Sequence, residues 1–291
     1  MKDFYQFSGG FIMTQTPFQN RLLTPLIRAC LVTLTALLPI CAVALPLFLN
    51  NLPPILYSLY EILVCLAYIA YTWFFTRIID RRPWSVLELK LDKNALKGFL
   101  AALLLTIVIV LLGSWLSIIF FHDRFSGTAR FGLPELWHSF ALSFLLQGFP
   151  EEMVWRGYLV QTLQKKPMPT LFISSTLFAL DHIVHIIPFF GGNPYDSEGY
   201  LTIFYAFCLG ILAFLMKFLF HTTWAAVAVH GGMHMTLQLL TAVIPGFYET
   251  KTMMLLTACL MLVVSAFIIY YQRQRLVSWE KLQPKQLSLD N

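Results

Sequence analysis

The sequence predicts an all-α membrane protein, a bundle of about eight transmembrane helices with both termini in the cytoplasm. Apolar residues make up 58% of the chain and charged residues only 12%, whereas ordinary soluble domains contain about 25% charged residues. The apolar residues also gather in runs of membrane-spanning length, and the basic residues lie mostly on one side of those runs. A chain of this kind cannot bury its apolar surface in a soluble core.

Candidate spans follow one another along most of the chain. A helix needs about 20 apolar residues to cross a bilayer, and the segments that meet or approach this length are 29–49, 55–76, 98–121, 136–163, 171–190, 200–216, 222–243 and 253–272. Pro39 and Pro46 are expected to kink the first span. This divides the chain into a cytoplasmic N-terminal segment (1–25), a membrane domain (26–272, with a motif-bearing core at 136–240) and a cytoplasmic tail (273–291).

The loop charges support eight spans over seven. With both termini inside, sixteen of the 20 Lys and Arg residues fall on the inner side. Arg124, Arg130 and Lys251 fall outside, and Arg156 lies within a span. This asymmetry is the positive-inside pattern of membrane proteins. The net charge of +5 therefore reflects topology, and we expect no nucleic-acid partner.

Three smaller features bear on class and location. The five cysteines lie in apolar runs without CxxC spacing, which argues against a disulfide framework or a thiolate metal site. The inner connection 79–96 is either an amphipathic helix on the membrane surface or an ordinary loop. Glu61, near an outer span end, is expected to reach the interface. No cleaved signal peptide is expected in the first 25 residues. The absence of any organelle signal and the compact chain favour a multi-pass protein of a bacterial inner membrane.

Span 136–163 contains Glu151, Glu152 and Arg156. Ionisable groups inside a membrane cost about 3 kcal/mol each on insertion scales and are usually functional. Residues four apart share a helix face, so Glu152 should pair with Arg156. Glu151 lies about 100° further round the helix and should face a cavity, where it could act as a general base. A purely structural charge network is the alternative.

Two later spans bring histidines at helical spacing. His182 and His185 are three residues apart, and His230 and His234 are four apart. The second pair could hold a metal or donate hydrogen bonds to an oxyanion, and the small residues around it would let a neighbouring helix approach closely. His185 could equally be a satisfied interhelical hydrogen bonder. Asp181 could orient a histidine or pair with Arg156.

The depths of these groups in the membrane are compatible with one site. At about 1.5 Å per residue, Glu151 lies about 18 Å, His182 about 17 Å and His230 about 12 Å from the inner ends of their spans. All three could therefore meet in one cavity between the midplane and the cytoplasmic face.

Together these motifs resemble the CPBP family (CAAX proteases and bacteriocin-processing enzymes, also called Abi) of intramembrane proteases, which includes the Ras-converting enzymes. The family motif Glu-Glu-x-x-x-Arg is present at Glu151–Arg156, and Phe-x-x-x-His is present at Phe178–His182. The third motif, His-x-x-x-Asn, begins at His230 but has His234 in place of Asn. The resemblance covers residues 136–240, and eight spans suit the family.

The resemblance implies roles for these residues. Glu151 and His182 would activate the attacking water, His230 with His234 would stabilise the oxyanion, and the supporting residues would be Glu152, Arg156 and Phe178. The family has been described both as metalloproteases and as metal-independent glutamate proteases. We favour the latter, without a cofactor, because a hydrogen bond to the oxyanion needs no ion and accommodates the usual Asn. The alternative is a zinc site formed by Glu151, His182, His230 and His234.

The leading hypothesis is therefore an intramembrane endopeptidase acting on a membrane-associated peptide or a lipidated protein tail, with membrane lipid as its other partner. A non-proteolytic bacteriocin-immunity or scaffold protein is the alternative from another class. A proton-coupled transporter is a third, since carboxylates and histidines in membranes also relay protons. Transporters often contain inverted repeats with broken helices in both halves, whereas every motif here lies in the second half of the chain, which disfavours that hypothesis.

Overall fold

The computed structural model describes residues 25–40, 54–121, 132–163, 166–244 and 246–277. Every regular element in these ranges is helical, which confirms the all-α prediction. The elements are α2 (Pro25–Thr35), α4 (Pro54–Trp73), η2 (Phe74–Ile79), η3 (Trp84–Leu87), α5 (Lys93–Phe121), α6 (Leu133–Phe140), η4 (Ala141–Gly148), α7 (Phe149–Glu152), η5 (Met153–Leu159), α8 (Val160–Leu163), α9 (Pro167–Asp181), η6 (His182–His185), η7 (Pro188–Phe190), α10 (Ser197–Phe220), α11 (Thr223–Val243) and α12 (Lys251–Val277).

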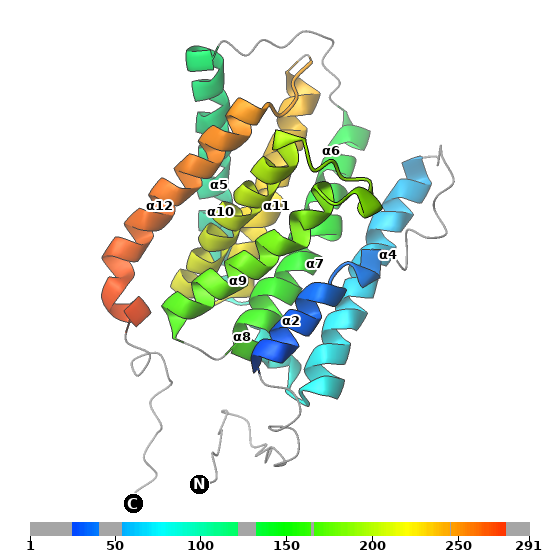
Figure 1. The fold of residues 1–291 in the computed structure, drawn as a ribbon, viewed down its shortest axis with the longest axis vertical. Helices are drawn as coiled ribbons and strands as arrows, with labels where there is room; N and C mark the ends of the chain where they lie inside the picture. Colours follow the sequence, from blue (N-terminus) through cyan, green and yellow to red (C-terminus); the bar gives the residue numbers. More distant parts are fainter. Residues whose placement is uncertain (1–24, 41–53, 122–131, 164–165, 245, 278–291) are drawn as a thin grey trace, which may run out of the picture.

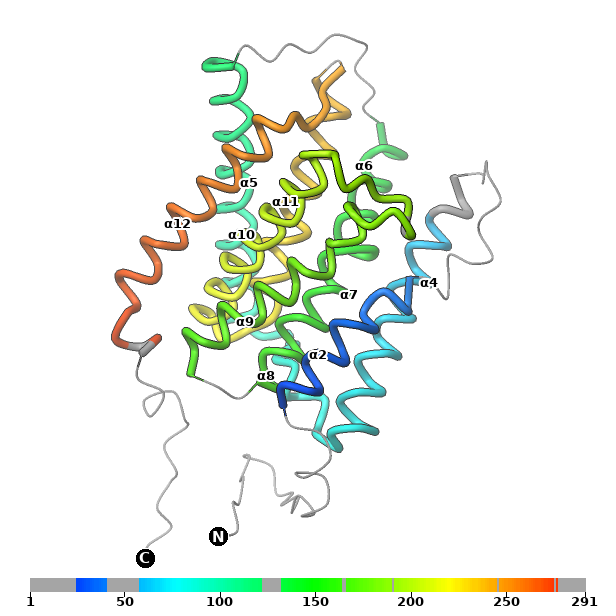
Figure 2. Tube along the Cα trace, in the orientation of Figure 1, coloured from blue at the N-terminus to red at the C-terminus, as the bar shows by residue number. Residues whose placement is uncertain are grey.

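Four helices in the described part of the chain are long and apolar enough to cross a membrane, so the chain is a multi-pass membrane protein. They are Ser58–Ile79, Lys93–Phe121, Ser197–Phe220 and Lys251–Gln274. Figure 1 shows α12 and α4 at opposite sides of the bundle, with α9, α10 and α11 between them. The Cα trace in Figure 2 shows the same order. Helix α11 packs against α5, η4 and α10, and this central position brings its histidines to the interior.

The helix ends differ from the predicted spans at two places. The first helix is interrupted by a turn at residues 36–37, just before Pro39, as expected from the proline ring; Pro46, Cys41 and the rest of that span lie outside the described residues. The span predicted at 171–190 is wrong in its second half, because α9 ends at Asp181. A 3-10 turn continues the chain to His185. Pro188 lacks an N–H and its ring would clash with the carbonyl of Val184, so it prevents a helix from continuing to residue 190.

Within the inner connection 79–96, residues 80–92 form a loop with one short 3-10 turn rather than a surface helix, and residues 93–96 already belong to α5. The backbone of this loop is tied to the start of α11. The Thr223 hydroxyl donates to the Leu87 carbonyl at 2.6 Å, and the Trp224 indole N–H donates to the Leu89 carbonyl at 3.0 Å. Glu88 in this loop forms an ion pair with the buried Lys217 of α10. The loop therefore fixes the position at which α11 enters the bundle.

The prediction that Glu61 reaches the membrane interface is wrong. The residue is 2% exposed, and its Oε1 lies 3.6 Å from Nδ1 of His138 on α6. The physical reason is that α4 runs beside α6 and η4, where the Trp137 indole donates to the Ser58 hydroxyl at 2.9 Å. Of the cysteines in the described part of the chain, Cys30, Cys65, Cys208 and Cys259 are free thiols.

The connection between α11 and α12 contains a carboxyl group whose protonation should influence stability. Glu249 is half-buried, and its Oε1 has no hydrogen-bond partner among the described residues. Burial, followed by the nearby charge of Glu198, raises the pKa of Glu249 from 4.5 to about 7. The folded state therefore binds this proton more tightly than the unfolded state. The resulting contribution to stability is complete below about pH 4.5 and is lost as the pH rises through 7.

We expect Glu249→Gln to become progressively more stable than the parent chain between pH 4.5 and pH 7. The gain should reach at most about 3 kcal/mol, since one pKa unit corresponds to about 1.4 kcal/mol. Unfolding in detergent, followed at a series of pH values, measures the difference. A difference that stays constant from acidic to alkaline pH would contradict the prediction.

Candidate active site

A buried charge network joins the helical run 133–163 to α11. Nη1 of Arg156 donates to Oε1 of Glu152 at 2.8 Å, which is the predicted pairing four residues apart. Nδ1 of His230 lies 3.0 Å from the same Oε1. Glu152 and Arg156 are fully buried, and His230 is 2% exposed. The contact between His230 and Glu152 was not predicted, because it joins residues 78 positions apart on different helices.

Glycines allow the two helices to approach closely enough for this contact. A Cβ atom added at Gly148 on η4 would lie 2.7 Å from Cα of Gly231 on α11, and one added at Gly231 would lie 2.4 Å from the Phe144 ring. Neither position can accept a side chain without movement of the helices. The close approach expected from the small residues of α11 is therefore present, and it lies directly beside His230.

Phe178 is the aromatic centre of the site. Its buried ring makes edge contacts with Trp155, His182 and His230, at centroid distances of 5.6, 5.0 and 5.6 Å. The Arg156 guanidinium carbon lies 4.5 Å from the same ring centroid, a cation–π contact. This phenylalanine therefore holds residues of all three motifs against one another.

The remaining predicted site residues lie close to this centre. His182 caps the end of α9, and its Nδ1 lies 3.0 Å from the Phe178 carbonyl oxygen. The His234 ring lies 5.2 Å from that of His230 and interacts electrostatically with both His230 and His182. Glu151 is half-buried, and its side chain makes no hydrogen bond or ion pair within the described part of the chain.

Asp181 belongs to the same region in a way that the sequence did not reveal. Its charge interacts with Glu151 and with Tyr71 of α4. In the described residues it makes no ion pair with Arg156, so that suggested role is wrong. The only feature of the sequence that indicated a place near the site was the position of Asp181 directly before His182. The His185 side chain is exposed and stacks at 6.2 Å on the His182 ring, away from the charge network.

The zinc alternative does not fit this geometry. No three His, Cys, Asp or Glu side chains in the described ranges are placed to hold a metal ion together. Glu151, His182, His230 and His234 gather in one region without converging on one point, so no step below passes through a metal.

Residues 133–236 match the family described as Type II CAAX prenyl endopeptidase Rce1-like. The matched range contains all three motifs, including the residues that surround Phe178. This chain carries an Rce1-like domain. No curated protein matched the chain significantly. The family that this range matches is described as a prenyl endopeptidase, so the match implies a peptidase.

The Rce1-like domain extends from α6 into α11 and so includes the whole charge network. The domain boundaries predicted from the sequence, including the motif-bearing core at 136–240, stay a prediction. Helices α2, α4, α5 and α12 lie outside it. Of these, α5 packs along α11 and α4 packs along η4, α7 and η5. The flanking helices therefore cover the domain on the sides where its own helices would otherwise be open.

Proposed function

We propose that the protein is an intramembrane endopeptidase that hydrolyses peptide bonds in membrane-associated or lipidated peptide substrates. A water molecule activated by Glu151 and His182 would be the nucleophile. The observation that supports this best is that the Glu151 carboxylate has no hydrogen-bond partner in the described part of the chain, whereas Oε1 of the neighbouring Glu152 is bonded to both Arg156 and His230. The two adjacent glutamates thus have different environments and can take different roles.

The hydrogen bonds of His182 suit water activation. Because a carbonyl oxygen only accepts, the His182 Nδ1–H must donate to Phe178, and the Nε2 of a neutral ring is then an acceptor. Glu151 and Nε2 of His182 could accept the two hydrogens of one water molecule. The oxygen lone pair would then face the substrate carbonyl, and Glu151 would take the proton as the C–O bond forms.

The two histidines of α11 differ in their ability to donate a hydrogen bond to the oxyanion. The His230 Nδ1–H donates to the Glu152 carboxylate, so its Nε2 can donate only when the ring is an imidazolium. His234 makes no hydrogen bond within the described part of the chain, so its ring N–H is available. We therefore propose that His234 is the principal hydrogen-bond donor to the oxyanion. His230, which is held by Glu152, is the neighbouring ring that packs beside His234.

This assignment predicts different outcomes for two substitutions of His234. His234→Asn keeps an N–H donor and should retain cleavage within about tenfold. His234→Ala removes the donor and should lower kcat by about 10²- to 10³-fold, the usual cost of losing one oxyanion donor. Initial rates on a farnesylated, internally quenched peptide measure both. Equal losses in the two variants would contradict a hydrogen-bonding role.

We extend the proposal to topology: eight spans with both termini in the cytoplasm, in a bacterial inner membrane. The helical segments in the described ranges support it, as does the gathering of basic residues at one end of α4, where Arg28 and Arg82 both bind Asp80. The segments 1–25 and 273–291 lie mostly outside the described residues, and their cytoplasmic location stays a prediction.

A non-proteolytic immunity or scaffold role is the second candidate. The observation in its favour is that the Glu152, Arg156 and His230 side chains join two helices through buried contacts. Such a network could serve only to hold the bundle together. Cleavage of the quenched peptide by purified protein, measured together with the Glu151 variant discussed below, separates the two roles.

A further inference from the structure

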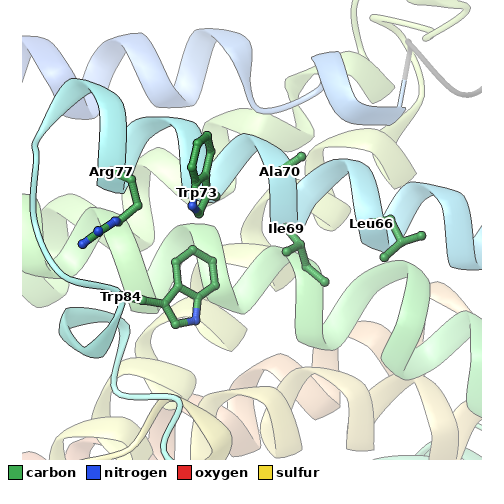
Figure 3. A pocket seen from close by; sticks show the side chains of 6 residues that line it. All are labelled: Leu66, Ile69, Ala70, Trp73, Arg77 and Trp84. Atoms are coloured by element: carbon green, nitrogen blue, oxygen red, sulfur yellow. The ribbon is translucent and has the colours of Figure 1, made fainter.

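A groove runs along α4 and η2, and the loop that carries Trp84 forms part of its wall. It has a volume of about 820 Å³, within the range of about 300–1,000 Å³ typical of ligand sites. Its lining is Leu66, Ile69, Ala70, Trp73, Arg77 and Trp84. Figure 3 shows the Trp73 and Trp84 side chains near one another, with Arg77 at one end of the row and Leu66 at the other.

The length of the groove corresponds to half a bilayer. Its lining on α4 and η2 extends from Leu66 to Arg77, which is about 16 Å at 1.5 Å per residue. The hydrocarbon core of a membrane is about 30 Å thick, or about 15 Å per leaflet. Because Arg77 lies near the end of the candidate span Ser58–Ile79, the apolar walls line one leaflet and the guanidinium lies at headgroup depth.

The cation at this end lacks a carboxylate partner. Arg77 forms no ion pair in the described part of the chain, and its Nη1 donates only to the Arg82 carbonyl at 3.3 Å. Asp80, the nearest acidic residue along the chain, is already bound by Arg28 and Arg82. The end of the groove at the membrane–water interface therefore carries an excess of positive charge. This charge favours binding of an anionic lipid headgroup.

The wall formed by Trp84 is fixed in place. Trp84 begins the short turn η3, whose last residue, Leu87, is fully buried and accepts a hydrogen bond from Thr223 of α11. Tryptophan also prefers the membrane interface. The groove is thus a built feature between α4 and an anchored loop, rather than a bare helix face.

We propose that this groove binds an anionic phospholipid, with an acyl chain along α4 and the phosphate at Arg77. A phospholipid is favoured over the lipid chain of a substrate because none of the residues assigned to the active site lines the groove. The bound lipid would hold the Trp84 loop against the start of α11, the helix that supplies His230 and His234.

The test uses the full chain in phosphatidylcholine nanodiscs that contain a minor fraction of lipid brominated on its acyl chains. Bromine quenches tryptophan fluorescence on contact, and a Trp73→Phe/Trp84→Phe double variant isolates the signal of the groove. Brominated phosphatidylglycerol should occupy the groove about fivefold more than brominated phosphatidylcholine, as expected for about 1 kcal/mol per basic residue. Arg77→Gln should remove that preference.

Two matched variants make the result specific. Arg81→Gln removes an exposed charge one turn beyond Arg77 that does not line the groove, and it should keep the preference. Ala70→Phe fills the groove from an exposed position and should reduce quenching by both lipids. Equal quenching by both lipids in the parent chain, or equal losses in Arg77→Gln and Arg81→Gln, would overturn the proposal.

Displacement of the brominated phospholipid by a farnesylated peptide would also overturn it, in favour of a substrate site. The quenching measurement does not depend on catalysis. Failure of the lipid-binding proposal can therefore be distinguished from failure of the proposed peptidase activity. Glu151→Gln should leave the quenching unchanged.

Discussion

Glu151→Gln is expected to abolish peptide cleavage, with a loss of at least about 10²- to 10⁴-fold, the range attributed to general acid–base catalysis. The amide keeps the size of the side chain but cannot take a proton from water. Glu151 makes no hydrogen bond or ion pair within the described ranges, so its replacement by the isosteric amide breaks neither kind of contact there. Initial rates on the farnesylated, quenched peptide measure the loss, and membrane insertion and thermal unfolding verify the fold.

Glu198→Gln is the matched control for this change. Glu198 is an exposed glutamate at the start of α10 and belongs to none of the three motifs, so its replacement should leave the cleavage rate unchanged. A Glu151→Gln variant that cleaves at the parental rate would remove the basis of the proposed mechanism. If the parent chain protects cells from a bacteriocin and the variant still does, the non-proteolytic role is favoured.

Arg156→Met should cause the largest loss of stability among single substitutions at the site. The change leaves Glu152 as a fully buried carboxylate with only His230 as a partner. Breaking a buried ion pair from one side typically costs about 3–5 kcal/mol. The cation–π contact with Phe178 is lost as well. Unfolding in detergent, monitored by circular dichroism, measures the cost.

The double variant Glu152→Gln/Arg156→Met tests the cause of that loss. Removal of the orphaned charge should recover part of the stability, since two uncharged groups of similar size replace the pair. Lys251→Met is a control, because the Lys251 and Asp196 side chains are about half exposed and exposed ion pairs contribute at most about 1 kcal/mol. A neutral Arg156→Met variant, or a double variant no more stable than the single one, would contradict this account.

Much of the site followed from spacing within single helices. The pairing of Glu152 with Arg156, and the proximity of His230 to His234, depend only on helical pitch, which is the same in every α-helix. The apolar runs likewise predicted α5 and α11 to within a few residues. The end of α9 was missed because Pro188 lies several residues beyond the point where the helix stops, and apolar composition continues past it.

Contacts between helices required the tertiary structure. The sequence by itself determined which residues occupy which helix face, because the rise and turn per residue are constant. It could not determine that His230 meets Glu152, that Asp181 lies near Glu151, or that Glu61 is buried against α6. Those contacts depend on which helices are neighbours and how deeply they pack, and that is decided by shape complementarity such as the approach of Gly148 to Gly231.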